Sequence, residues 1–194
     1  MAAHQKKARR LRASLAFIDE SALLLSPLVR RTWSPRGRGA ILRQRTRHHQ
    51  KLSVIAALVV SRSRHRVRLC FRLHLDRAVD SPKAAAFLRQ LGGQVRGPIL
   101  VVWDRLNAHR SKVIRAFAAR RPRFRIEFLP PYAPELNPVE YAWSWLKTNP
   151  LANYAPQDAT DLARSARSHG RRLQHKSSLL WSFIEHRPLP LRHK

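Results

Sequence analysis

The hydrophobic pattern of residues 52–75 is the feature that most constrains the fold of this 194-residue chain. Residues 52–60 are apolar at nearly every position, which suits either a strand buried on both faces or a buried helix segment, and the β-branched residues favour the strand. Residues 66–75 alternate instead, with Val67, Leu69, Phe71, Leu73 and Leu75 on one face and Arg66, Arg68, Cys70, Arg72 and His74 on the other. This alternation predicts a half-buried strand, paired antiparallel to the first through the turn at residues 61–65.

The segments around this hairpin predict an α/β protein. A short apolar run over residues 15–20 reads as a buried strand, and residues 23–25 form a candidate second element. The elements expected after the hairpin are a helix over 81–91 that ends at Gly92-Gly93, a strand over 98–104, a helix over 113–118, a strand over 124–128, and helices over 138–147, 157–174 and 179–184. Three antiparallel strands followed by alternating helices and strands predict a mixed sheet flanked by helices.

The charge of the chain points to a polyanionic partner. Lysine and arginine number 39 against 11 aspartates and glutamates, which gives a net charge of +28. Nucleic acid is the leading candidate partner for such a chain. The longest uninterrupted apolar run, residues 54–60, is far shorter than the roughly 20 residues of a membrane span, so no membrane partner is expected. Cys70 is the only cysteine, which fits a reducing intracellular compartment.

Two basic segments are candidates for contact with that partner. Residues 30–47 are dense in arginine and are broken by proline and glycine, which predicts either a loop on a phosphate backbone or a solvated loop. The helix expected over residues 157–174 is the second candidate, on charge alone. The basic composition of residues 1–12 predicts a mobile N-terminal arm. The proposed DNA contacts are Arg30, Arg31, Arg36, Arg38, Arg43, Arg45, Arg47 and Lys147.

The proline-rich block at residues 128–147 predicts a strand end, a stiff loop and a helix start. Asn137 suits the N-cap and Pro138 the first helical position, which places Glu140 in the first turn. Glu140 then either bonds back to the backbone of Asn137 as a capping box or carries a functional carboxylate.

Four acids lie at the ends of apolar elements and are candidates for a metal site. Asp19 and Glu20 end the first strand, Asp104 ends the fourth, and Glu140 opens a helix. If the two strands are neighbours, Asp19 and Asp104 meet at one edge of the sheet, and oxygen ligands of this kind select Mg²⁺ or Mn²⁺. Two such ions, about 3.5–4 Å apart, assist in-line phosphoryl displacement. The alternatives are that Asp104 caps a turn with Asn107, that Glu20 is a surface charge, and that Glu140 caps its helix.

Three sequence blocks resemble the signature motifs of a known family. They are Phe17-Ile-Asp-Glu-Ser21, Trp103-Asp-Arg-Leu-Asn-Ala-His109, and Leu129-Pro-Pro-Tyr-Ala-Pro-Glu-Leu-Asn-Pro-Val-Glu-Tyr-Ala-Trp143. The family is the DDE endonuclease domain of mariner-like transposases from bacterial insertion sequences. The resemblance implies a ribonuclease-H-like fold in which Asp19, Asp104 and Glu140 are catalytic and hold two magnesium ions. The candidates for supporting residues are Glu20, Asn107, His109 and Asn137.

The resemblance also implies the reaction and the partners. A member of this family cuts DNA at the ends of its element, and the freed 3′-hydroxyl then attacks target DNA, favouring a TA dinucleotide. A homodimer in the bacterial cytoplasm, associated with the nucleoid, is expected. Residues 13–150 would form the catalytic core, 151–187 the C-terminal helices of the same domain, and 188–194 a loose tail.

Two departures from the family pattern bear on this interpretation. Arg105 stands where an asparagine usually follows the second aspartate. Relatives carry helix-turn-helix modules before the catalytic domain, so we expect a separately encoded N-terminal part. The alternatives are an inert, truncated remnant that binds DNA or inhibits an intact transposase, and a resolvase or ribonuclease of the same fold.

Overall fold

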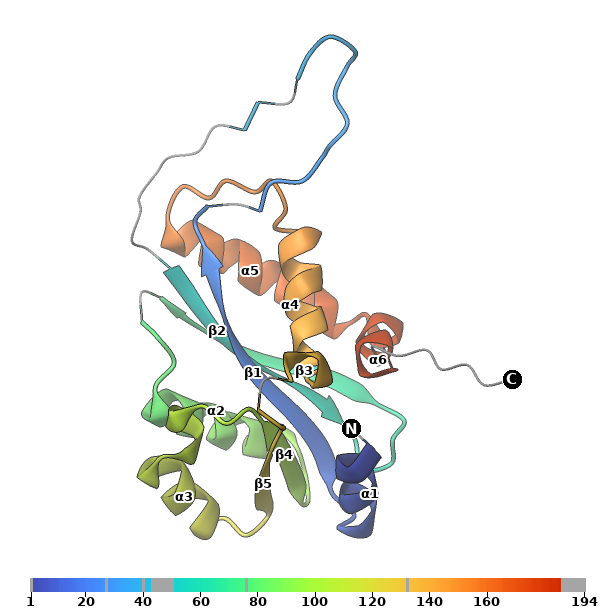
Figure 1. The fold of residues 1–194 in the computed structure, drawn as a ribbon, viewed down its shortest axis with the longest axis vertical. Helices are drawn as coiled ribbons and strands as arrows, with labels where there is room; N and C mark the ends of the chain where they lie inside the picture. The colour runs from blue at the N-terminus through green and yellow to red at the C-terminus, as the bar shows by residue number, and fades with distance from the viewer. Residues whose placement is uncertain are drawn as a thin grey trace, which may run out of the picture.

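The computed structural model describes residues 2–26, 28–39, 41–42, 51–75, 77–131 and 133–185, and its centre is a five-stranded mixed sheet (Figure 1). The strands are β1 (Ser14–Leu24), β2 (Lys51–Val60), β3 (Val67–Leu75), β4 (Ile99–Trp103) and β5 (Phe124–Phe128). They lie in the order β3-β2-β1-β4-β5, with β1, β2 and β3 antiparallel and with β4 parallel to both β1 and β5. The predicted mixed sheet is therefore confirmed.

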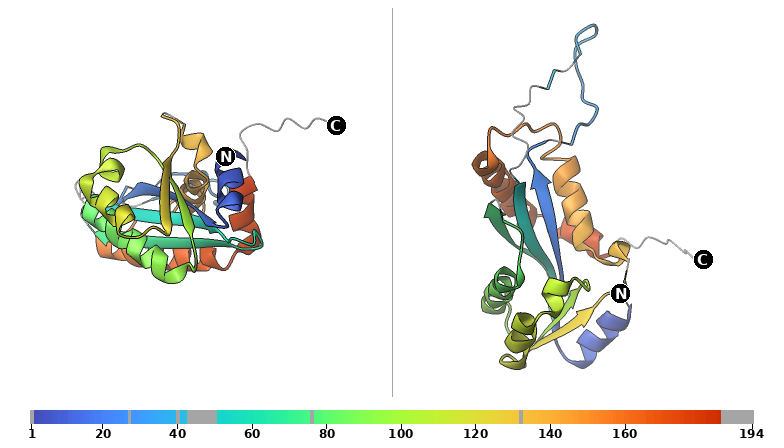
Figure 2. Two further views of the ribbon diagram at one scale, coloured as in Figure 1. Left: turned by 90° about the horizontal axis from the view of Figure 1, so that it is seen from below. Right: turned by 60° about the vertical axis from the view of Figure 1, so that its left-hand side comes forward.

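Helices cover both faces of this sheet (Figure 2). The helices are α1 (Ala2–Arg10), α2 (Ser81–Gln94), α3 (Lys112–Ala119), α4 (Val139–Thr148), α5 (Ala159–Gln174) and α6 (Ser177–Glu185), with two 3₁₀ turns, η1 (Asn107–Arg110) and η2 (Pro134–Leu136). Buried residues of α2 and α3 pack with one face of the sheet, and those of α4, α5 and α6 pack with the other. We call these the α2/α3 face and the α4 face.

The register of the central strands brings two acids to one edge of the sheet. Phe17 of β1 pairs with Val102 of the parallel strand β4. Asp19 and Asp104 each lie two residues further along, so they reach the same level of the sheet. Asp104 directly follows the end of β4, whereas Asp19 lies inside β1 and does not end the strand as the sequence predicted. Because neighbouring residues of a strand point to opposite faces, Asp19 lies on the α4 face and Glu20 on the α2/α3 face.

A glycine allows α5 to pack directly on the sheet. A Cβ atom at Gly170 would lie 2.7 Å from the ring of Phe71 in β3, which is closer than real side chains approach. The contact explains a glycine in the interior of a helix, where it otherwise costs about 1 kcal/mol relative to alanine. Glycine here allows close packing.

The structure corrects several predicted boundaries. Residues 23–25 are not a second element, because β1 runs unbroken to Leu24. Gly92-Gly93 do not end α2, which continues to Gln94 with Gly92 facing the ring of Phe124. The expected mobile arm contains helix α1, in which Ala8 is fully buried and Lys7 pairs with Glu127.

Some predictions fall outside the described residues, namely Arg43, Arg45 and Arg47 and the tail at 188–194. None of the helices in the described part of the chain is long and apolar enough to cross a membrane.

Candidate active site

Asp19 is a buried carboxylate on the α4 face. It lies in the middle of β1, is 8% exposed, and accepts a hydrogen bond of 2.7 Å at Oδ2 from the indole Nε1 of Trp143 in α4. Burial, followed by the nearby negative charge of Glu140, raises the pKa of Asp19 to about 8, although the Trp143 hydrogen bond lowers it. The smaller effects of Glu20 and Asp104 act in the same direction as burial. The Oδ1 atom has no hydrogen-bond partner among the described residues.

Asp104 is anchored from the other face by His109. The Nδ1 atom of His109 lies 2.5 Å from Oδ1 of Asp104, which also accepts a hydrogen bond of 3.3 Å from the backbone of Leu106. The Nε2 atom of His109 lies 3.1 Å from Oε2 of Glu20, so the imidazole bridges two carboxylates. Asp104 caps a turn, as the structural alternative predicted, but through the amide of Leu106 and not with Asn107. Its Oδ2 atom has no partner within the described chain.

His109 is held in a buried position by a stacked ring. It is 2% exposed and stacks on Trp103 with ring centroids 3.8 Å apart. Burial lowers the pKa of His109, but the hydrogen bonds to Asp104 and Glu20 outweigh it and raise the pKa to about 9. The ring is therefore protonated at neutral pH and donates to both carboxylates.

Asn137 ties the start of α4 to β1. Its buried amide donates to the carbonyl of Ile18 at 2.9 Å and accepts from the amide of Val139 at 3.2 Å. The helix begins at Val139, but Pro138 already has helical dihedral angles while Asn137 is extended, so Asn137 acts as the predicted cap. The capping-box alternative for Glu140 is wrong, because the amide of Asn137 donates to the carbonyl of Pro134.

The three acids line one cleft of about 580 Å³. Its opposite wall is formed by the proline-rich segment after β5, and Arg105 and Arg110 also line it. The guanidinium of Arg105 donates from Nε to the carbonyl of Leu129 at 3.2 Å, which leaves its two terminal nitrogens free within the described chain. The cleft thus combines three carboxylates with two cationic side chains.

The donor chemistry of the cleft suits a hard divalent cation. Asp19, Asp104 and Glu140 offer only oxygen, and each aspartate has one oxygen fixed by the protein and the other free. No group of three or more His, Cys, Asp or Glu side chains in the described ranges is already close enough to hold a metal ion. The chemical type of the three side chains therefore suits a divalent cation.

The remaining predicted residues have different surroundings. Asn107 opens η1, is exposed, and does not line the cleft. Arg30 packs against the end of α4, where it donates to the carbonyl of Thr148 at 3.1 Å and pairs through its backbone with Asn153. Arg31, Arg36 and Arg38 are exposed on the long β1–β2 connection.

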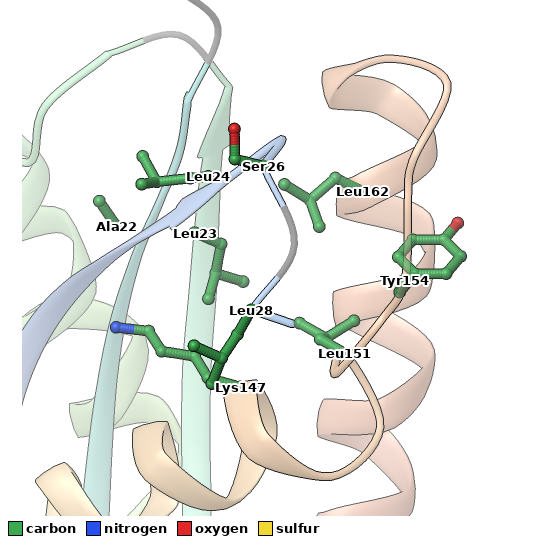
Figure 3. A pocket seen from close by; sticks show the side chains of 9 residues that line it. All are labelled: Ala22, Leu23, Leu24, Ser26, Leu28, Lys147, Leu151, Tyr154 and Leu162. Atoms are coloured by element: carbon green, nitrogen blue, oxygen red, sulfur yellow. The ribbon is translucent and has the colours of Figure 1, made fainter. Parts of the chain in front are cut away.

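Lys147 has a structural contact rather than a free amine. Its Nζ donates to Ser21 of β1 at 2.8 Å. Lys147 also lines a mostly apolar hollow of about 400 Å³ with Leu23, Leu28 and Leu151 (Figure 3). The hollow lies at the C-terminal end of α4, away from Glu140 in the first turn.

Sequence reasoning missed the roles of Trp143 and Arg110, and it noted Arg105 only as a departure from the family pattern. Trp143 reads as a core residue, and it is 5% exposed, but its indole N–H holds Asp19. The available signal was its spacing of three residues from Glu140, which places both on one face of α4. Arg105 adjoins Asp104 in sequence, and Arg110 follows His109.

The fold and this cleft define a ribonuclease-H-like domain with clustered carboxylates. A family model described as DDE superfamily endonuclease matches residues 14–163, and the chain belongs to that family. No curated protein matches the sequence significantly. These findings confirm the family resemblance of the three sequence blocks.

Solved structures share the fold at low sequence identity. The Mos1 transposase paired-end complex with left transposon end gives a TM-score of 0.69 at 14% identity, covering 95% of this chain and 54% of that chain. The catalytic domain of Mos1 mariner transposase gives 0.59 at 14% identity, covering 95% and 80%. A simian T-cell lymphotropic virus intasome in complex with PP2A regulatory subunit B56 gamma gives 0.53 at 14% identity, covering 93% and 57%. The chain therefore spans about half the length of the Mos1 chain in the paired-end complex.

Proposed function

We propose that this chain is the catalytic domain of a transposase, which cuts DNA at transposon ends and joins them to target DNA. The observation that carries the proposal is the convergence of Asp19, Asp104 and Glu140 on one cleft in a DDE endonuclease fold. Membership of the family and the Mos1 complexes with transposon-end DNA support DNA as the substrate.

Divalent metal ions are the proposed cofactor, with Mg²⁺ or Mn²⁺ as the natural choice and two ions as the expected number. Mos1 paired-end complexes were solved with each of these metals. When bound, such ions activate the attacking oxygen and stabilise the leaving oxygen of a phosphodiester. The free Oδ1 of Asp19, the free Oδ2 of Asp104 and the carboxylate of Glu140 would hold them.

The chain's own residues would orient the ligands and the scissile phosphate. Trp143 fixes one oxygen of Asp19, and His109 fixes one oxygen of Asp104, so neither aspartate rotates freely. Asn137 sets the height of Glu140 relative to β1. Arg105 and Arg110 lie where a guanidinium can hold the non-bridging oxygens of a phosphate opposite the carboxylates.

The wider assignment follows the family. We propose a homodimer that brings two transposon ends together, a preference for TA targets, and action on the bacterial nucleoid. The chain's net charge of +28 supports a DNA partner.

The test is nicking of supercoiled DNA by the purified chain in Mg²⁺ or Mn²⁺, beside an Asp104→Asn variant. We expect wild-type nicking that needs the metal and a loss of at least about 100-fold in the variant, because each ligand positions the reacting oxygens. Glu135→Gln is the matched control, since Glu135 lies in η2 close to the cleft in sequence but does not line it. Equal nicking by wild type and Asp104→Asn would contradict the proposal.

A further inference from the structure

A pocket rich in arginine lies at the end of the sheet opposite the carboxylates. It has a volume of about 600 Å³ and is formed by the β2–β3 turn, the start of β3 and the connection between α2 and β4. We call it the arginine pocket and define it by Arg62, Arg66, Arg68 and Arg96. Ser14, at the start of β1, also lines it, and the five residue steps from Ser14 to Asp19 span about 17 Å of strand.

The charges of this pocket are not neutralised by the protein. No aspartate or glutamate lines it. In the part of the chain that the structure describes, the guanidinium groups of Arg62, Arg66 and Arg96 form no hydrogen bond or ion pair, and Arg68 donates only to the carbonyl of Gln94 at 3.4 Å. By contrast, Arg164 on α5 pairs with Asp161. Four guanidinium groups around one hollow repel one another unless an anion lies between them.

The backbone that carries these side chains is well fixed. The β2–β3 turn is closed by a hydrogen bond of 2.8 Å from the amide of Ser61 to the carbonyl of Arg66, and the hydroxyl of Ser61 accepts from the amide of Arg66 at 3.2 Å. Arg64 adopts a left-handed conformation with φ of 61° at the turn. A fixed turn reduces the entropy lost when its arginines bind a ligand.

The pocket and the catalytic cleft face different directions. Arg68 pairs with Val59, and Val59 and Cys70 pack with α2, so Arg68 points to the α2/α3 face. Asp19 lies on the α4 face in the middle of β1, five positions along the strand from Ser14. One stretch of DNA seated on Asp19 is therefore not expected to fill both.

We propose that the arginine pocket binds the phosphodiester backbone of a DNA segment other than the one in the cleft. Guanidinium forks match phosphate oxygens, and the serine hydroxyls of the turn add uncharged hydrogen-bonding groups. Such contacts carry no sequence information and suit DNA that is held but not cut. The inference rests on the proposed function only in taking DNA as the partner.

The test is hydrogen exchange with a random-sequence DNA duplex in EDTA, so that it does not depend on catalysis. We expect DNA to slow exchange at residues 61–68 and 94–97 of the wild type. An Arg66→Gln/Arg96→Gln variant should lose this protection, bind about 3- to 10-fold more weakly, and lower the slope of log affinity against log salt by about 1–2, since each phosphate contact contributes about 0.9. Arg68 is left intact because it contacts Gln94.

The control is Arg89→Gln/Arg115→Gln, which removes the same charge from exposed positions on α2 and α3. It should keep the protection at 61–68. DNA binding by the wild type without protection of residues 61–68 would overturn the inference but not the proposed function. Equal losses of DNA affinity in the two double variants would have the same meaning. A wild type that binds no DNA would overturn the DNA partner of the proposed function as well. Equal protection by inorganic pyrophosphate at the same phosphate concentration would identify a small-phosphate site and also overturn the proposal.

Discussion

The carboxylates on the two faces of the sheet have opposite electrostatic surroundings. On the α4 face, Asp19 is buried beside Glu140 with only the neutral indole of Trp143 as a donor, and its pKa is raised to about 8, chiefly by burial. On the α2/α3 face, the cationic ring of His109 joins Asp104 to Glu20. One face therefore makes a negative charge costly and the other neutralises it. A cation between Asp19 and Asp104 would offset the unfavourable negative charge of Asp19. On the other face, His109 would keep Asp104 oriented toward that cation.

The largest effect on this arrangement should come from Asn137, which connects the α4 face to β1. We expect Asn137→Ala to lower the free energy of unfolding by about 2–4 kcal/mol, because the Ile18 carbonyl loses its buried donor and the helix loses its cap. Urea denaturation measures it. A loss below about 0.5 kcal/mol in Asn137→Ala would show that Asn137 does not connect the two elements.

On the α2/α3 face, we expect His109→Phe to cost about 2 kcal/mol at pH 6, since the charged hydrogen bonds are lost while the ring can still stack on Trp103. The folded pKa of about 9 lies above the ordinary value of 6.5, so this contribution is complete below pH 6.5 and disappears as the pH rises through 9. Thermal melts at intervals from pH 6 to 10 should show a smaller decline in His109→Phe than in the wild type, most clearly above pH 8, where Asp19 has already lost its proton. His175→Gln, at the exposed end of α5, is the control.

On the α4 face, we expect the mutation of an acid to raise the free energy of unfolding instead of lowering it. We expect Asp19→Asn to stabilise the metal-free protein by about 1–2 kcal/mol at pH 7, because it removes a buried carboxyl group that must take up a proton on folding and keeps an acceptor for Trp143. The pKa of Asp19 is raised from 3.8 to about 8, so its favourable contribution is complete below pH 3.8 and is lost as the pH rises to 8. Asp19→Asn should flatten the stability profile between pH 4 and 6, where His109 does not titrate. Destabilisation by Asp19→Asn at pH 7 would contradict the comparison.

The smallest effect should come from the indole hydrogen bond alone. Trp143→Phe keeps a ring in the core and removes the donor to Asp19, so we expect a loss of about 1 kcal/mol and a further rise in the pKa of Asp19. A ¹³C titration of the Asp19 carboxyl measures the pKa. Trp145→Phe, on the same helix and without a contact to Asp19, is the control.

Local patterns were enough to predict the sheet but not the contacts around the acids. The alternation in residues 67–75 predicted β3 because one face of that strand is buried, and the proline and asparagine at 137–138 predicted the start of α4. Gly92-Gly93 wrongly predicted a helix end because Gly92 packs against Phe124, which approaches only in the folded chain. The hydrogen bond from Trp143 to Asp19 joins residues 124 apart in sequence, so no periodicity could reveal it.

The sequence also could not predict which arginines lie close together in the fold. Density along the sequence drew attention to residues 30–47, where Arg30 proves to hold the end of α4. The arginine pocket collects side chains from the turn after β2, from β3 and from the segment before β4, which adjoin only when the sheet forms. The net charge can be counted from the sequence, but only the folded structure shows which charged side chains lie close together.

The most direct test of the central claim is Mn²⁺ binding to the DNA-free protein, followed by calorimetry or electron paramagnetic resonance for the wild type, Asp19→Asn, Asp104→Asn and Glu140→Gln. We expect each variant to bind at least about tenfold more weakly than the wild type, and we expect wild-type affinity to rise with pH up to about 8 as Asp19 loses its proton. Wild-type affinity in all three variants would show that these carboxylates, from both faces of the sheet, do not form one metal centre.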